Sequence, residues 1–196
     1  MWDPEPGASA GIIDWPTWTA LAVPDHRPDG ELHYALDVSP QGGSAAVGVS
    51  DGIHVECVKH DEGTAWVVPL CVARRDRFRE LVIDPAGPAV ELIAPLEAEG
   101  LSVRRVSTED AKAACGQFLT DVTEGRVVHR GQPMLDQAVQ NADKRDVGDG
   151  GWLWSRKRST VDISPLYAVT LAKWAAGATP PVVASGFLAL DDLLED

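Results

Sequence analysis

Residues 32–59, LHYALDVSPQGGSAAVGVSDGIHVECVK, contain three short apolar runs that are joined by two turn-forming segments. The first run, 32–38, ends at an SPQGG turn, and the second, 44–50, ends at Asp51-Gly52. An Asp-Gly pair between strand-like runs is a strong signal for a tight hairpin. The third run, 53–59, alternates apolar and polar residues as a half-buried strand does. These residues therefore predict an antiparallel meander of three strands.

After the meander, helical and strand patterns follow one another. Pro69 falls within the first helical pattern, so that helix either begins near Val68 or is kinked. Strands that are joined through helices favour parallel pairing, so the predicted fold class is α/β: a mixed sheet with helices on both faces. The predicted helices lie at 64–77, 88–99, 108–124, 132–143 and 163–176, and the predicted strands at 80–83, 101–106, 126–129 and 152–154.

The two ends of the chain differ in composition from its middle. Residues 1–30 are rich in Pro, Gly and Asp, and predict a linker-like segment with one short helix that is capped by Asp14 and runs to Leu21. Residues 178–196 predict an acidic C-terminal tail. We therefore expect the globular domain to span residues 31–177.

Composition excludes several classes of protein. The chain has 196 residues, of which 44% are hydrophobic, which is enough for an ordinary core. No run approaches the ~20 apolar residues that cross a membrane, and the first residues do not have the pattern of a secretory signal. Cys57, Cys71 and Cys115 are odd in number and far apart, so we expect buried thiols in a reducing cytoplasm rather than disulfides or a zinc site.

The net charge of −13 at first argues against a nucleic-acid partner, because affinity for DNA comes largely from Lys and Arg contacts with phosphates. The basic residues are nevertheless clustered, which allows a local basic surface on an acidic protein. The clusters are Arg74-Arg75, Arg104-Arg105, Lys144-Arg145 and Arg156-Lys157-Arg158.

Three aspartates stand at the edges of predicted elements. Asp37 lies within the first strand, Asp84 directly follows the 80–83 strand, and Asp162 precedes the last helix. Each also has a structural interpretation: a solvent-facing strand residue for Asp37, an Asx turn for Asp84 and a helix cap for Asp162. If the strands of Asp37 and Asp84 are neighbours and the last helix crosses them, the three carboxylates converge. Converging carboxylates need a cation, and oxygen ligands without Cys or His favour Mg²⁺ or Mn²⁺.

The residues around these aspartates resemble a known family. LDVSP (36–40), VIDPAGPA (82–89) and RKRSTVDISPLYAVTLAKWA (156–175), with HDEGTAWVV (60–68), are similar to the nuclease domain of the large terminase subunit of tailed bacteriophages. The resemblance extends over about residues 31–177. It implies a ribonuclease H-like fold, and it implies that Asp37, Asp84 and Asp162 are the metal-binding catalytic acids.

The resemblance also implies an activity and partners. The expected activity is metal-dependent endonuclease cutting of concatemeric DNA during viral genome packaging, with one or two Mg²⁺ or Mn²⁺ ions. The expected partners are double-stranded DNA, the terminase small subunit, the portal and an ATPase motor, in the cytoplasm of the infected bacterium. No GxxxxGK[ST] phosphate loop occurs in the sequence. The chain is therefore expected to be either a nuclease fragment or a short relative without its motor. GASAGIIDWPTWTAL (7–21) resembles the segment that joins motor and nuclease, which favours the fragment.

Further residues are candidates with weaker support. Arg156, Lys157 and Arg158, and also Lys144 and Arg145, are candidate DNA-binding residues through phosphate contacts, although solvated charge runs are common. His60 is a candidate for proton transfer. Two alternatives to a packaging nuclease stay open: another ribonuclease H-like nuclease, such as a junction resolvase or RNA–DNA hybrid nuclease, and a non-catalytic interaction module. The acidic segment LDDLLED (190–196) would suit such a docking module.

Overall fold

Strand β1 lies inside a six-stranded sheet whose strand order is β5-β4-β1-β2-β3-β6. The structure is a computed structural model, and it describes residues 11–178. The strands are β1 (His33–Val38), β2 (Ser44–Ser50), β3 (His54–Glu62), β4 (Glu80–Ile83), β5 (Val103–Arg105) and β6 (Val128–His129). β1, β2 and β3 pair in antiparallel fashion, which confirms the predicted meander. β4 is parallel to β1 and β5 is parallel to β4, as the helical connections predict.

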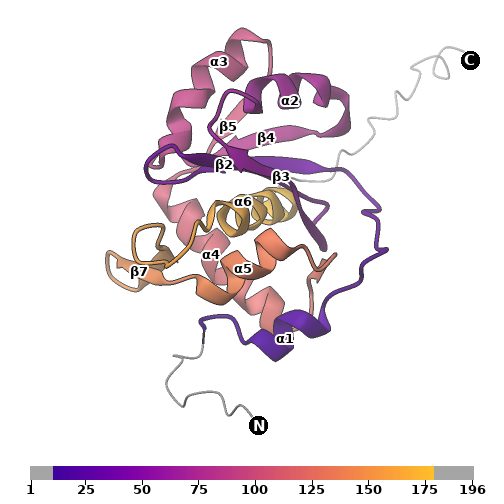
Figure 1. The fold of residues 1–196 in the computed structure, drawn as a ribbon, viewed down its shortest axis with the longest axis vertical. Helices are drawn as coiled ribbons and strands as arrows, with labels where there is room; N and C mark the ends of the chain where they lie inside the picture. Colours follow the sequence, from indigo (N-terminus) through magenta and orange to yellow (C-terminus); the bar gives the residue numbers. More distant parts are fainter. Residues whose placement is uncertain (1–10, 179–196) are drawn as a thin grey trace, which may run out of the picture.

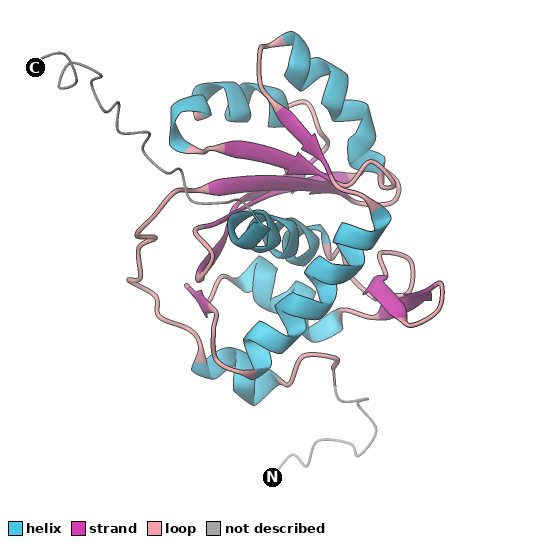
Figure 2. Ribbon diagram, turned by 180° about the vertical axis from the view of Figure 1, so that it is seen from behind, coloured by secondary structure: helices cyan, strands magenta, loops and turns pink. Residues whose placement is uncertain are grey.

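Helices cover both faces of this sheet (Figure 1). One face carries α2 (Val67–Ala73), the 3-10 turn η2 (Pro88–Leu92) and α3 (Ile93–Ala98). The opposite face carries α4 (Thr108–Thr123), α5 (Pro133–Asn141) and α6 (Ser164–Ala178), and Figure 2 shows the same layers from behind. The alternation of strand residues explains the two faces, because successive side chains point in opposite directions. Leu36 and Ile83 therefore pack with α2 and α3, whereas Ala35 and Val82 belong to the core beneath α4 and α6.

Helix α6 lies directly across the centre of the sheet, and Gly48 makes room for it. A Cβ atom added to Gly48 would lie only 2.6 Å from the backbone nitrogen of Val169. The β2–β3 register also shifts between Val47 and Gly48. Because Gly48 has no side chain, the α6 backbone approaches β2 closely, and α6 also packs against β1, β3 and β4.

Two predicted helices are interrupted in the structure. The segment 64–77 forms α2 from Val67 and a separate 3-10 turn, η1 (Arg75–Arg77), so Pro69 lies in the first turn of α2 where its missing N–H is not needed. The segment 88–99 forms η2 and then α3. Pro95 has no N–H to donate to the carbonyl of Glu91, which explains why an α-helix does not run through the whole segment.

A second, two-stranded sheet lies at the side of the main one. β7 (Lys144–Val147) pairs with β8 (Gly151–Trp154) in an antiparallel hairpin. The sequence predicts only the second strand, because Lys144, Arg145 and Asp146 are exposed and show no apolar alternation. Trp154 is buried and donates its indole N–H to Thr170 Oγ1 on α6, which fixes the hairpin to the core.

The described part of the N-terminal segment packs on the core. α1 (Trp15–Ala20) begins after Asp14, whose carboxylate accepts from the Thr17 N–H at 2.9 Å, as predicted for a cap. Trp18 is fully buried and stacks on His129 with ring centroids 3.8 Å apart. The acidic C-terminal tail, including 190–196, lies outside the described residues. Within residues 11–178, no helix is long and apolar enough to cross a membrane. The three cysteines are free and buried, as expected.

Candidate metal centre and cleft

Asp37 and Asp84 stand side by side at one edge of the sheet. Leu36 of β1 pairs with Ile83 of β4 in parallel register, so the next residue on each strand is an aspartate. Both carboxylates face the α6 side, because Leu36 and Ile83 face the opposite side. Asp37 is fully buried and Asp84 is 3% exposed. Two acids are thus removed from water next to each other, an arrangement that is unfavourable unless a positive charge accompanies it.

Arg156 supplies that positive charge. Its Nε donates to Asp37 Oδ2 at 2.9 Å and its Nη2 donates to Asp37 Oδ1 at 2.6 Å, so the pair is bidentate. The same Nη2 lies 3.6 Å from Asp84 Oδ2. One guanidinium therefore faces both carboxylates. Burial raises the pKa of the Asp37 carboxyl, and the charge and hydrogen bonds of Arg156 oppose that rise.

The Arg156 guanidinium lies in a fitted seat. Its Cζ lies 3.9 Å from the ring centroid of Tyr167, a buried residue of α6. Gly87 also leaves space for the guanidinium, since an added Cβ there would lie 2.9 Å from Nη2. The Tyr167 hydroxyl donates to Asp84 Oδ2 at 3.0 Å. Burial raises the pKa of Tyr167, which keeps this hydroxyl a donor at neutral pH.

The turn after β4 uses the other oxygen of Asp84. Asp84 Oδ1 accepts from the Ala86 N–H at 2.9 Å, and the Gly87 N–H donates to the Asp84 carbonyl at 3.2 Å. This is the Asx turn that the sequence also suggests. Asp84 thus shapes the turn with one oxygen and faces Arg156 and Tyr167 with the other.

Asp162 belongs to a neighbouring hydrogen-bond group. Its Oδ2 accepts from Ser44 Oγ at 2.5 Å and from Ser164 Oγ at 3.0 Å, and lies 2.8 Å from His60 Nε2. Its Oδ1 accepts from the Ser164 N–H at the start of α6, as a capping acid does. Burial alone would raise the pKa of Asp162, but the hydrogen bonds from His60, Ser44 and Ser164 hold that pKa well below its ordinary value.

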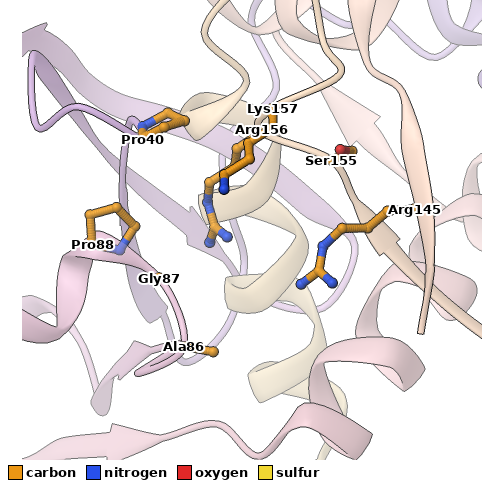
Figure 3. Close-up of a pocket in the computed structure, with 8 residues that line it drawn as sticks. All are labelled: Pro40, Ala86, Gly87, Pro88, Arg145, Ser155, Arg156 and Lys157. Carbon is orange, nitrogen blue, oxygen red and sulfur yellow. The ribbon is translucent and has the colours of Figure 1, made fainter. Parts of the chain in front are cut away.

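Two clefts open at this edge of the sheet. One, of about 680 Å³, lies between Ser39, Ser44, Arg156 and Asp162. The other, of about 450 Å³, lies between the turn after β4 and the β7–β8 hairpin (Figure 3). In that view Arg145 and Arg156 both extend into the cleft, from the hairpin and from the chain before α6. Arg156 and Lys157 line both clefts, so this surface is locally basic on an acidic protein. Asp37 and Asp84 line neither cleft and lie behind Arg156, which contacts both of them.

The other four predicted phosphate-binding residues lie on the β7–β8 hairpin or directly after Arg156 in the chain. Lys144, Arg145, Lys157 and Arg158 are exposed. Arg158 donates to the Lys144 carbonyl at 3.2 Å, and Lys144 Nζ lies 5.8 Å from the Trp152 ring centroid. Arg156 differs from these four because its side chain is 13% exposed and is directed at Asp37.

The donor set fits a hard cation in part. Carboxylate oxygens are the ligands that Mg²⁺ and Mn²⁺ prefer, and Asp37 and Asp84 already share one positive group. Within residues 11–178, however, no three His, Cys, Asp or Glu side chains are grouped so that they would hold one metal ion. The structure thus brings Asp37 and Asp84 together and keeps Asp162 in its own group beside the same cleft.

Three participants in this site carry no signal in the sequence. Tyr167 has the pattern of a core residue in an apolar helix, Gly87 that of an ordinary turn residue, and Ser44 that of a strand end. Their roles depend on contacts between distant segments: Ser44 and Asp162 are separated by 118 positions. His60, a weak candidate in the sequence, contacts Asp162 directly.

Comparison with solved structures identifies similar folds. The large terminase of bacteriophage HK97 has a TM-score of 0.67 at 17% identity over 84% of this chain, which spans only 43% of that protein. The large terminase nuclease from thermophilic phage G20c, solved with bound magnesium, has a TM-score of 0.59 at 16% identity, covering 78% of this chain and 85% of that one. A variant of the nuclease domain of bacterial virus Sf6, solved with manganese, has a TM-score of 0.59 at 12% identity, covering 87% of this chain and 100% of that one.

These similarities confirm the predicted α/β fold, and they confirm at the level of fold the resemblance to phage terminase nuclease domains. No protein-family profile matches the chain, and no curated protein matches it in sequence.

Proposed function

We propose that this chain is a metal-dependent endonuclease that hydrolyses phosphodiester bonds of double-stranded DNA during viral genome packaging. The observation that carries the proposal is the pair of buried carboxylates, Asp37 and Asp84, at the end of two parallel strands and in contact with Arg156, which lines a basic cleft. Ligand sites in open α/β sheets gather at this edge. The likeness in fold to terminase nucleases supports the same assignment.

Each group of residues has a proposed role. Asp37 and Asp84 hold Mg²⁺ or Mn²⁺, as one or two ions, and Asp162 completes the catalytic set. The bound cation would activate a water molecule and stabilise the leaving oxygen. His60, Ser44 and Ser164 contact Oδ2 of Asp162 and fix its orientation, while Oδ1 accepts from the Ser164 N–H. A carboxylate that is fixed by such bonds needs little rearrangement to act as a ligand.

The basic residues hold the DNA. Arg145 and Lys157 lie where a phosphate backbone would enter the cleft, and Lys144 and Arg158 extend the same surface. Contacts of this kind position a strand without reading its sequence, so we expect low sequence specificity. We assign the ATPase motor, the terminase small subunit and the portal to partners, and we place the reaction in the cytoplasm of the infected bacterium.

Plasmid nicking tests the proposal. With Mn²⁺ the chain should convert supercoiled plasmid to open-circular and linear forms, and EDTA should stop the reaction. Asp37→Asn should reduce the rate by about 100-fold or more, because charge stabilisation at a reaction centre contributes on that scale. Asp25→Asn, at an exposed position, should cut like the parent. Equal cutting by the parent and Asp37→Asn would refute the assignment.

One observation favours a second function, a non-catalytic module. Arg156 satisfies both oxygens of Asp37, so the acidic pair is already neutralised in part without any metal ion. A chain that binds DNA or a portal but never cuts with Mn²⁺ would be such a module. A junction resolvase would instead cut a four-way junction in preference to the plasmid.

A further inference from the structure

The arginine beside the acidic pair occupies the place of a cation. Both Asp37 oxygens accept hydrogen bonds from the one guanidinium, at 2.6 and 2.9 Å, and the same group lies 3.6 Å from Asp84. A cation that approached the two carboxylates from the cleft would meet this guanidinium first. The two positive groups compete for the same oxygens, because like charges repel strongly in a poorly solvated site.

The seat of this arginine is specific for a planar group. The Tyr167 ring centroid lies 3.9 Å from the guanidinium carbon, and Gly87 leaves room for the guanidinium because it has no Cβ. Stacking on an aromatic ring and a two-pronged bond to a carboxylate are properties of arginine that lysine does not share. The Arg156 side chain is only 13% exposed, in contrast to the exposed Lys157 and Arg158 that follow it. The contact is therefore built into the core rather than made by a loose surface chain.

The surroundings also allow Arg156 to leave. Two carboxylates and one guanidinium leave an unbalanced negative charge, so the site still attracts a cation. Arg156 belongs to the connection between β8 and α6, and it lies between clefts of about 450 and 680 Å³. A side chain that rotates into either cleft would move from this buried position into solvent beside Lys157, where a DNA phosphate would be bound.

We propose that Arg156 is an internal competitor for the metal site: it neutralises Asp37 in the metal-free protein, and a divalent cation binds only when the guanidinium moves into the cleft. This inference rests on the proposed function. It makes Arg156 a positioning residue that links metal binding to DNA binding, since a phosphate in the cleft would hold the displaced guanidinium. Metal affinity is then reduced by the fraction of molecules in which Arg156 still covers the acids.

Calorimetric titration of the full chain with MnCl₂, without DNA, tests this directly. Arg156→Gln keeps a planar side chain and removes the charge, and we expect it to bind Mn²⁺ about tenfold more tightly than the parent. Asp37→Asn in the same background should abolish this binding. In EDTA the Arg156→Gln protein should melt below the parent, and added Mn²⁺ should raise its Tm by more than it raises the parent's. Should the variant be too unstable to titrate, Arg156→Lys, which keeps the charge but loses the fork, should show an intermediate gain.

Lys157→Gln is the matched control, because it removes the same charge from the same clefts without touching the carboxylates. It should change Mn²⁺ affinity by less than about threefold, since exposed charges are screened. Equal gains in Lys157→Gln and Arg156→Gln, or no gain in Arg156→Gln, would overturn the inference.

The outcomes separate the inference from the proposed function. If Mn²⁺ binding depends on Asp37 but has the same affinity in Arg156→Gln as in the parent, only the competitor role is refuted. Tight Mn²⁺ binding by Arg156→Gln, in a chain that never cuts DNA, supports the competitor role and refutes the nuclease. Absence of Asp37-dependent binding in every variant refutes both.

Discussion

The carboxylate of Asp162 is held by donors from three segments: Ser44 on β2, His60 on β3 and Ser164 on α6. These bonds join the meander to the last helix, so Asp162 stabilises the fold whether or not it also binds a metal ion. A residue with two such roles explains why its position before a helix suggested both a cap and a ligand. The bond to the Ser164 N–H is the capping contact, and the cleft beside it is the candidate functional one.

The pH dependence of folding should reveal this role of Asp162. Because its pKa is lower in the folded protein than in the unfolded chain, its stabilisation is fully present above the ordinary pKa of about 3.8 and is lost as the pH falls below that value. Asp162→Asn should therefore lower the free energy of unfolding most between pH 5 and 7, by about 1 kcal/mol or more, because a neutral amide replaces a carboxylate that accepts charge-assisted hydrogen bonds from His60 and Ser44. The difference from the parent should shrink below about pH 4. Urea titrations at several pH values measure it, and a pH-independent difference would contradict the assignment.

Much of the site could be predicted from the sequence at this scale, and the remainder could not. Asp37 and Asp84 follow from local rules, since one sits in an apolar strand and the other directly after one. Their meeting follows from parallel pairing. The partner of Asp37 does not: Arg156 lies 119 positions away, and a basic run beside a glycine-rich turn predicts a solvated surface equally well. Tyr167 was hidden because a buried hydroxyl in an apolar helix looks like any core residue.

Among the elements, α6 determines the geometry of the site. It runs across β1, β2 and β3, and it carries Tyr167 at the acidic pair and Ser164 at Asp162. The strong apolar pattern of its sequence makes the helix itself predictable. The distance between α6 and the sheet cannot be predicted in the same way, because it depends on Gly48 in the strand opposite the helix. The β7 strand escaped prediction for another reason: its exposed polar residues pair through backbone groups, which leave no mark on composition.

Gly48→Ala tests the close approach of α6. The new methyl group would collide with the backbone of Ala168 and Val169, which cannot move aside as a side chain can. We expect a loss of about 1–3 kcal/mol in the free energy of unfolding, the usual range for overpacked cores. Gly116→Ala is the control: it lies in α4 with nothing within 4 Å, and it should stabilise the protein by up to about 1 kcal/mol. Chemical denaturation of both variants gives the comparison, and a neutral Gly48→Ala would show that α6 tolerates displacement.

The molecule as a whole is strongly acidic, but one cleft on its surface is basic. Its net charge is −13, yet Arg145, Arg156 and Lys157 meet at one cleft. If the proposed function holds, long-range repulsion weakens DNA binding at low salt, and the proposed phosphate contacts in the cleft favour it. The composition alone argues against DNA, and only the arrangement of the β7–β8 hairpin beside the turn after β4 brings the basic residues together.

The salt dependence of DNA binding distinguishes the contribution of the cleft residues to DNA affinity from that of the rest of the surface. Arg145→Gln should weaken the binding of DNA duplexes of different sequence by about the same factor. It should also reduce the slope of log K against log salt concentration by about 1, as expected for one lost phosphate contact. Arg79→Gln removes a charge at the opposite end of β4, where Arg79 pairs with Glu31, and should leave the slope unchanged. Fluorescence anisotropy in Ca²⁺, without Mn²⁺, gives both slopes. An equal effect of the two substitutions would mean that DNA does not enter this cleft.

The span of 119 residues between Asp37 and Arg156 has a consequence for synthesis on the ribosome. The first strand is made before Arg156, so its carboxylate has no cationic partner until these further 119 residues have been added. Tyr167 and the rest of α6 emerge later still. A nascent chain thus carries two acids at a strand edge that cannot be buried without cost. The centre therefore cannot be assembled before Arg156 and Tyr167 have been made, and a chain that is terminated before them contains the acids without a folded site.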